Sequence, residues 1–229
     1  MYPLRSITFI AELIHPPVSY TVEDLQQIHH RAFPDDRTRY ANFQVGQGGA
    51  QMANPSPRPG AVSAALVGAD RLRIQEQMTG MSREDFQARV GELARILLEV
   101  GKVSTFVAEQ FLIQSLINPR SNAPANEFLT GTLFSMESSD LEAFERPVGI
   151  VGLRLSFPMT QAEQPLFNVR VEGYERDPRS LFLENVGLFR TPVASANLDD
   201  LGDQFEQTYA YIEGQVVPFI ARFDGKPRP

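Results

Sequence analysis

The sequence predicts a protein of the α+β class, with mostly antiparallel sheets and with helices on one face of them. Short runs rich in β-branched and aromatic residues alternate with stretches whose apolar residues recur at every third or fourth position. Clusters of glycine and proline separate these segments. We expect a packed core, because 42% of the 229 residues are hydrophobic and 16 residues are phenylalanine.

The first predicted elements are a strand and a helix. Residues 5–13 contain several β-formers, and a pair of prolines follows this strand. Thr21 and Asp24 have the spacing of a capping box, so a helix is expected to start there and to end before Pro34. Its apolar stripe consists of Leu25, Ile28 and Ala32.

Three strands and a loop are expected next. Residues 39–45 predict a second strand, and residues 46–60 predict a loop because they hold four glycines and three prolines. Residues 61–67 and 72–77 predict a hairpin. Polar and apolar residues alternate from position 70 to position 76, which is typical of a strand with one face toward solvent.

The second predicted helix has a marked beginning and end. Ser82 and Asp85 repeat the capping pair, and Gly101 suits the left-handed position that follows many helices. Residues 104–117 then predict a long strand. The buried side of the helix is expected to consist of Phe86, Val90, Leu93, Leu97 and Val100.

The same order of elements starts again after a proline-containing linker at 118–126. Ser139 and Glu142 suit a short helix before Pro147, and Asn197 and Asp200 suit the start of a last helix, which Pro218 should kink or end. Strands are predicted at 127–136, 148–157, 167–174 and 180–189. The apolar side of the last helix is Leu201, Phe205, Tyr209, Ile212 and Val216.

This order predicts two ferredoxin-like β-α-β-β-α units. The first would occupy residues 1–120 and the second residues 121–229, as two domains or as one continuous domain. The similarity lies in the order of the elements and not in the residues themselves.

Composition restricts the function. The net charge of −7 argues against nucleic acid as a partner, since phosphate binding needs clustered basic residues. The absence of cysteine excludes disulfides, thiolate metal sites and cysteine nucleophiles, and it permits a cytoplasmic location. No run approaches the ~20 apolar residues that a membrane helix needs. We therefore expect a soluble protein that does not bind a membrane.

No motif predicts catalysis, a metal or a cofactor. The glycines at 46–49 are followed by prolines and not by the helix that a phosphate-binding loop requires. His29 and His30 are adjacent, so they point about 100° apart on a helix and do not form a zinc pair. No Gly-x-Ser-x-Gly sequence is present. Whether the protein is an enzyme stays open at this point, and we favour that it is not.

Arginines in the second half are candidate ligand-binding residues. Arg170 and Glu172 alternate with valines, so both should project from one face of a strand, and Arg154 lies on the strand before it. A solvated sheet face with paired charges is the simpler interpretation. The alternative is that Arg154, Arg170 and Glu172 bind an anionic small molecule.

Three segments carry a resemblance to a known family. They are Val151-Gly152-Leu153-Arg154, the run Leu181-Phe182-Leu183-Glu184-Asn185, and the acidic helix that follows Leu198. With them the chain resembles a sporadically distributed bacterial family of uncharacterised proteins, which has no assigned activity and hence implies no functional residues.

Two functions are compatible with these observations. The first is a non-enzymatic interaction protein that forms a homo-oligomer or binds a protein partner, because exposed strand edges favour pairing with another chain. The alternative is a small-molecule-binding protein or an enzyme with a site between the two halves.

Overall fold

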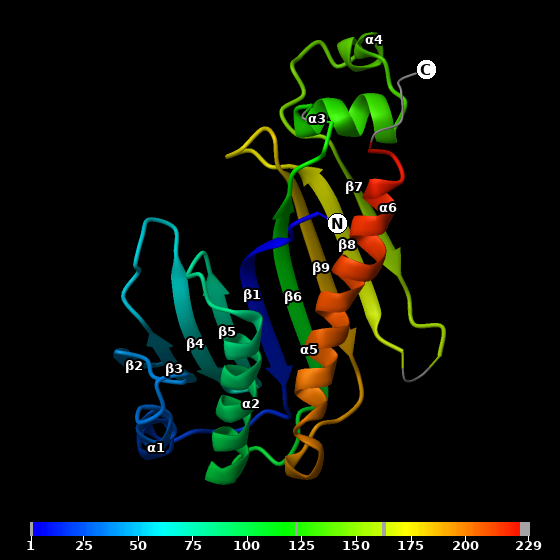
Figure 1. Cartoon of the computed structure of the whole chain (residues 1–229). Helices are drawn as coiled ribbons and strands as arrows, with labels where there is room; N and C mark the ends of the chain where they lie inside the picture. Colours follow the sequence, from blue (N-terminus) through cyan, green and yellow to red (C-terminus); the bar gives the residue numbers. More distant parts are fainter. Residues whose placement is uncertain (1, 122, 162–163, 225–229) are drawn as a thin grey trace.

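The computed structural model describes residues 2–121, 123–161 and 164–224. Nine strands form a single sheet in the order β2-β3-β4-β5-β1-β6-β9-β8-β7, and each pair of neighbours is antiparallel (Figure 1). The strands are β1 (Arg5–Ile14), β2 (Asn42–Gly46), β3 (Gly49–Ala53), β4 (Val62–Gly68), β5 (Arg71–Gln77), β6 (Ala108–Ile117), β7 (Gly152–Phe157), β8 (Leu166–Gly173) and β9 (Leu181–Phe189).

The long helices lie against one face of this sheet, as expected for the α+β class (Figure 1). Among the described residues, no helix lies against the other face of the sheet, which we call the uncovered face (Figure 1). The helices are α1 (Val22–Ala32), α2 (Arg83–Val100), α3 (Ala125–Glu127), α4 (Ser138–Glu142), α5 (Asp200–Tyr211) and α6 (Val217–Ala221), with the 3-10 turn η2 (Ser195–Asn197) and the π-helical turns η1 (Phe128–Leu133) and η3 (Ile212–Val216).

Alternation along the strands decides which side chains the helices cover. On β1, Phe9, Ala11 and Leu13 are at most 3% exposed and face the helices, whereas Ile10 and Glu12 between them are partly exposed on the uncovered face. Phe9 contacts the rings of Phe86 on α2 and Phe205 on α5, with centroids 5.3 and 5.6 Å apart. The core therefore joins residues from both ends of the chain.

Local signals place the two capped helices as predicted. Thr21 and Asp24 form a reciprocal capping box at the start of α1. Ser82 accepts a hydrogen bond from the Asp85 backbone N–H at 3.0 Å, and Gly101 adopts the left-handed conformation that ends α2. The predicted hairpin of β4 and β5 is also confirmed.

The loop predicted at 46–60 is wrong in part, because it contains β3. Gly46 and Gly49 face each other across the end of a β2–β3 hairpin, and Gly48 has a φ of 84° in the turn. Ala50 and Met52 on β3 are buried beneath α1. The glycines thus form a tight hairpin turn, for which positive φ favours glycine.

The strand predicted at 127–136 is wrong, since residues 127–133 are helical and belong to α3 and η1. A short apolar run does not by itself distinguish a strand from a buried helical turn. Here Phe128 and Leu129 are buried side by side at the turn, and the Thr130 hydroxyl donates to the carbonyl of Asn126 at 2.9 Å. The second half therefore does not begin with a strand.

The two halves meet within the sheet, because β6 of the first half pairs with β9 of the second along nine residues. The last helix also passes Pro218: α5 ends at Tyr211, and the path continues through the π-helical turn η3 into α6. Pro218 is the second residue of α6, which follows directly on η3, so the hydrogen-bond pattern of the helix changes just before the proline but the helical path does not end there. Among the described residues, no helix is long and apolar enough to cross a membrane.

Candidate functional site

The structure brings Arg154, Arg170 and Glu172 together on the uncovered face of the sheet. Arg154 on β7 stands opposite Arg170 on β8 in the strand register. Arg170 forms ion pairs with Glu172 at 3.6 Å and with Glu184 on β9 at 3.1 Å. All three predicted residues lie on β7 and β8 of the second half.

The surroundings of Arg170 neutralise most of its charge. Its guanidinium lies 4.9 Å from the ring centroid of Phe182, and Glu184 also accepts a hydrogen bond from Gln114 at 2.7 Å. The buried Nε of Arg170 has no hydrogen-bond partner among the described residues. The group is therefore a charge network on a sheet face, with one N–H donor left over.

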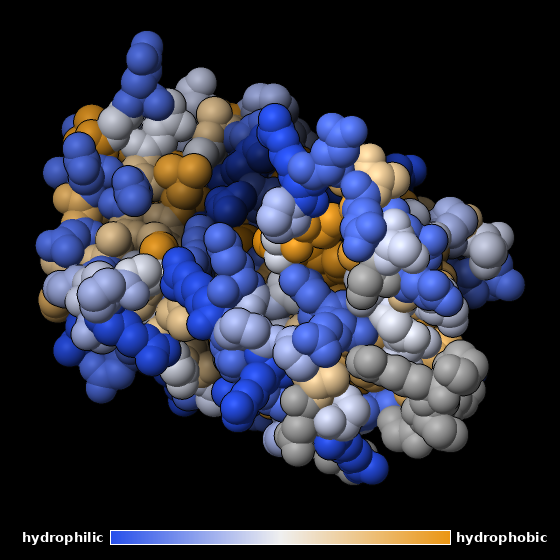
Figure 2. All heavy atoms as spheres, turned by 90° about the horizontal axis from the view of Figure 1, so that it is seen from above, coloured by the Kyte–Doolittle hydropathy of each residue, from blue (hydrophilic) through white to orange (hydrophobic). Residues whose placement is uncertain are grey.

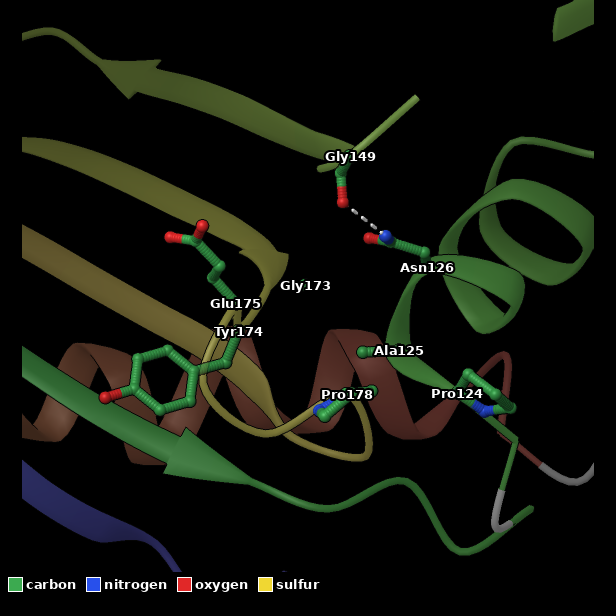
Figure 3. A pocket seen from close by; sticks show the side chains of 8 residues that line it. All are labelled: Pro124, Ala125, Asn126, Gly149, Gly173, Tyr174, Glu175 and Pro178. Atoms are coloured by element: carbon green, nitrogen blue, oxygen red, sulfur yellow. Dashed lines mark hydrogen bonds between the residues drawn. The ribbon is translucent and has the colours of Figure 1, made fainter. Parts of the chain in front are cut away.

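A small pocket lies at the end of β8, next to α3 (Figure 3). Its volume is about 130 Å³, which is below the usual range for ligand pockets. Asn126 donates to the carbonyl of Gly149 at 2.8 Å and accepts from the backbone N–H of Val151 at 3.2 Å, so its amide is occupied. The ring of Tyr174 and the carboxylate of Glu175 point away from Asn126 (Figure 3). The polar side chain of Asn126 in this pocket therefore serves contacts within the protein and is not available to bind a ligand.

A second hollow, of about 240 Å³, lies on the uncovered face over β3, β4 and β5. Its cation, Arg73, is paired with Glu12 at 3.0 Å. No group of three or more potential metal ligands occurs in the part of the chain that the structure describes. Neither hollow brings together a nucleophile, a base and a free charge.

Two buried acidic residues lie on the helix-covered face of the sheet. Glu76 on β5 pairs with Arg89 of α2, and Ser63 donates to Glu76 at 2.7 Å. Glu109 on β6 is fully buried, and neither of its carboxyl oxygens has a hydrogen-bond partner among the described residues. Burial raises the pKa of Glu109 to about 8, with Asp200 adding to the rise and the Gln204 side chain opposing it. Both residues are buried, so neither carboxyl group is open to a ligand from solvent.

The most distinctive surface is the outer edge of β7, which is one of the two outermost strands of the sheet (Figure 1). Leu155 and Phe157 are 39% and 38% exposed. Their side chains point to the helix-covered face of the sheet, where α5 packs on β6 and β9. Seen from the end with α3 and α4, the surface is mostly hydrophilic and apolar residues reach it in separate patches (Figure 2).

We call the segment from Phe144 to Phe157 the apolar edge. It adds Phe144, Val148 and Ile150 to the two exposed side chains on β7, and Phe144 is 67% exposed. Phe157 also touches Tyr211 of α5, with ring centroids 5.4 Å apart. Several exposed apolar residues within one short segment favour a binding surface there.

The hydrogen bonds of β7 show which backbone groups are free. Gly173 donates to the carbonyl of Val151 at 3.1 Å, so residue 151 points its backbone toward β8. In an antiparallel pair this orientation alternates. Leu153, Leu155 and Phe157 therefore bond to β8, while Gly152, Arg154 and Ser156 direct their N–H and C=O groups away from the sheet.

Comparison with known proteins does not assign this chain to a family. No model of a protein family matches the chain, and no curated protein matches it.

The sequence gives little indication of the apolar edge. Its apolar residues stand at even positions up to Ile150 and at odd positions from Val151, so the alternation breaks between them. That break is consistent with a strand that begins only at Gly152, but exposure at an edge depends on the strand order. Strand order is a tertiary property and is not encoded in the pattern of one segment.

Proposed function

We propose that this protein is a non-enzymatic interaction protein that self-associates through an edge of its sheet. The apolar edge carries the proposal, because it combines exposed apolar side chains with backbone groups of β7 that pair with no other strand among the described residues. An edge strand of this kind is a template for pairing with another chain. A cytoplasmic location and membership of the resembled bacterial family are part of the same proposal and rest on the sequence alone.

The opposite edge, β2, is a weaker candidate. Its Phe43 is partly buried, and its ring stacks on that of His29 on α1 at 4.6 Å. Val45 is 36% exposed, and it is the one large apolar residue of β2 that reaches this exposure. We therefore place self-association at β7.

The ferredoxin-like duplication also stays a proposal. Its support lies in the first half, where α1 and α2 connect four strands in the spatial order β4-β5-β1-β6. This is the arrangement of a β-α-β-β-α-β unit, with the β2–β3 hairpin inserted at its outer side.

Sedimentation equilibrium at tens of micromolar tests the proposed function. We expect the unmodified protein to have a mass of twice 25.6 kDa or a higher integer multiple of it. Leu155→Lys should return it to a monomer, because the substitution places a charge in the buried centre of the interface. The matched control is Leu66→Lys, which changes a residue of similar exposure, 42%, on the uncovered face of β4. A strict monomer for the unmodified protein would contradict the proposal.

The alternative function is small-molecule binding at Arg154 and Arg170. The strand register favours it, because Arg154 and Arg170 stand opposite each other and an anion bound between them would offset the repulsion of the two cations. Isothermal titration with inorganic phosphate, citrate and nucleotides tests it, with Arg154→Ala and Arg170→Ala as variants. If any of these anions binds and both variants lose that binding, this alternative replaces the first proposal.

A further inference from the structure

We propose that the partner at the apolar edge is a second copy of this chain, whose β7 pairs antiparallel with β7 across a two-fold axis that passes between the two Leu155 residues. The inference rests on the proposed self-association and specifies its geometry. It joins two nine-stranded sheets edge to edge into one.

The faces of the two sheets limit the registers. Residues directly opposite each other in an antiparallel pair point to the same face, so odd positions of β7 must oppose odd positions. Across a two-fold axis, four registers keep at least three residues of β7 paired, with Leu153, Arg154, Leu155 or Ser156 opposite its own copy. The Leu153 register pairs only residues 152–154, whereas the Leu155 register pairs residues 153–157. The Arg154 register places two arginines in direct opposition, which is destabilising.

The Leu155 register is complementary on both faces. On the helix-covered face, Leu155 meets Leu155 and Leu153 meets Phe157, so all side chains in contact are apolar. On the uncovered face, Arg154 meets Ser156, and no like charges oppose each other. The charged and apolar positions of this one short strand thus match those of its own copy.

Backbone bonding fits the Leu155 register and disfavours the Ser156 register. Arg154 and Ser156 direct their N–H and C=O groups outward, and in the Leu155 register each exchanges both groups with the other residue of the second copy. That gives four hydrogen bonds around the axis. In the Ser156 register, Arg154 would instead oppose Pro158, which has no N–H. Pro158 also prevents the pairing from extending beyond the end of β7.

Engineered cysteines test this register, and the chain contains no native cysteine to interfere. Leu155 would form a non-hydrogen-bonded pair with its copy, with Cα atoms about 4.5 Å apart, which suits a disulfide. We expect Leu155→Cys to form a disulfide-linked dimer with oxidised glutathione, seen on a non-reducing gel. Leu153→Cys and Phe157→Cys, each tested alone, should give no disulfide-linked dimer on the gel, since either residue lies about 14 Å from its own copy. Mixed together, these two variants should form a heterodimer.

The remaining variants separate failure of the register from failure of self-association. Arg154→Cys and Ser156→Cys place the thiol about 8 Å from its copy in the Leu155 register, which is too far for a disulfide. Dimers from either variant, with none from Leu155→Cys, would overturn the register while leaving self-association in place. Monomers in every variant, together with a monomeric unmodified protein in sedimentation, would overturn both. Samples in urea show the background of random cross-linking.

Discussion

At the scale of single residues, Arg89 and Glu76 form the best-enclosed ion pair of the described chain. Their side chains are 5% and 1% exposed, and Ser63 and the ring of Tyr40 complete the surroundings. Two charges removed from water gain little net stability together, but removal of one leaves the other uncompensated.

Arg89→Met should therefore lower the free energy of unfolding by about 3–5 kcal/mol, because Glu76 would stay buried without a cation. The matched control is Arg95→Met on the exposed side of the same helix, where the pairs with Glu92 and Glu99 should be worth no more than about 1 kcal/mol. Urea unfolding of both variants measures the difference. Equal losses would show that burial of the Glu76–Arg89 pair does not matter.

Glu109 should make the protein less stable as pH rises. The pKa of its carboxyl is raised from an ordinary 4.5 to about 8, so between these values the folded state keeps a proton that the unfolded state has lost. Stability then falls with pH, by at most about 1.4 kcal/mol per unit, and levels off above the folded pKa. Glu109→Gln keeps the shape and should remove this slope, as measured by urea unfolding from pH 5 to pH 9.

Asp24→Asn is the control for that series. Hydrogen bonding to Thr21 holds the pKa of Asp24 below its ordinary value of 3.8, so this group stabilises the fold above that value and loses the effect only in more acidic solution. Its removal should leave the slope between pH 5 and pH 9 as it is. A Glu109→Gln variant with an unchanged slope would mean that another group causes it.

At the scale of elements, Asn126 connects the helical segment α3 to the start of β7. Its side chain bonds to Gly149 and Val151, the residues just before the strand. Asn126→Leu removes both bonds, and we expect faster amide exchange at Val151, with β9 unchanged. Asn126→Asp, which keeps the acceptor, should have an intermediate effect. Equal exchange in all three proteins would show that the start of β7 is held by other contacts.

Elements with local signals could be predicted from the sequence, and those that depend on neighbours could not. Thr21 and Ser82 mark their helices through caps that need only adjacent residues. Phe128 and Leu129 belong to a short apolar run, and their burial depends on the rest of the fold and not on the residues next to them. The pairing of Arg154 with Arg170 follows from strands at adjacent positions, whereas the exposure of Leu155 follows from the position of β7 at the end of the strand order.

At the scale of the whole molecule, one sheet and one core extend across both halves. Phe111 of β6 contacts Phe189 and Phe205 from the second half, with ring centroids 6.1 and 5.8 Å apart. Tyr2 donates to Asp224, which also accepts from the backbone N–H of Ser121 at 3.1 Å. These contacts couple the beginning, the middle and the end of the described chain.

The protein should therefore unfold in a single calorimetric transition. Met52→Ala on β3 and Val171→Ala on β8 remove buried groups near opposite ends of the sheet, and both should lower the same transition temperature. Two transitions, each sensitive to one of these variants, would show that residues 1–120 and 121–229 fold as separate domains.

Self-association through β7 predicts a change at particular backbone groups. In a monomer the N–H groups of Arg154 and Ser156 face solvent, and in the proposed dimer they donate to the second copy. Amide hydrogen exchange of β7, measured at sub-micromolar and at high-micromolar concentrations, tests this most directly. The account predicts slower exchange at Arg154 and Ser156 in the concentrated sample, with no change at β2. Equal exchange at both concentrations in a protein of dimeric mass, or protection at β2 instead, would contradict it.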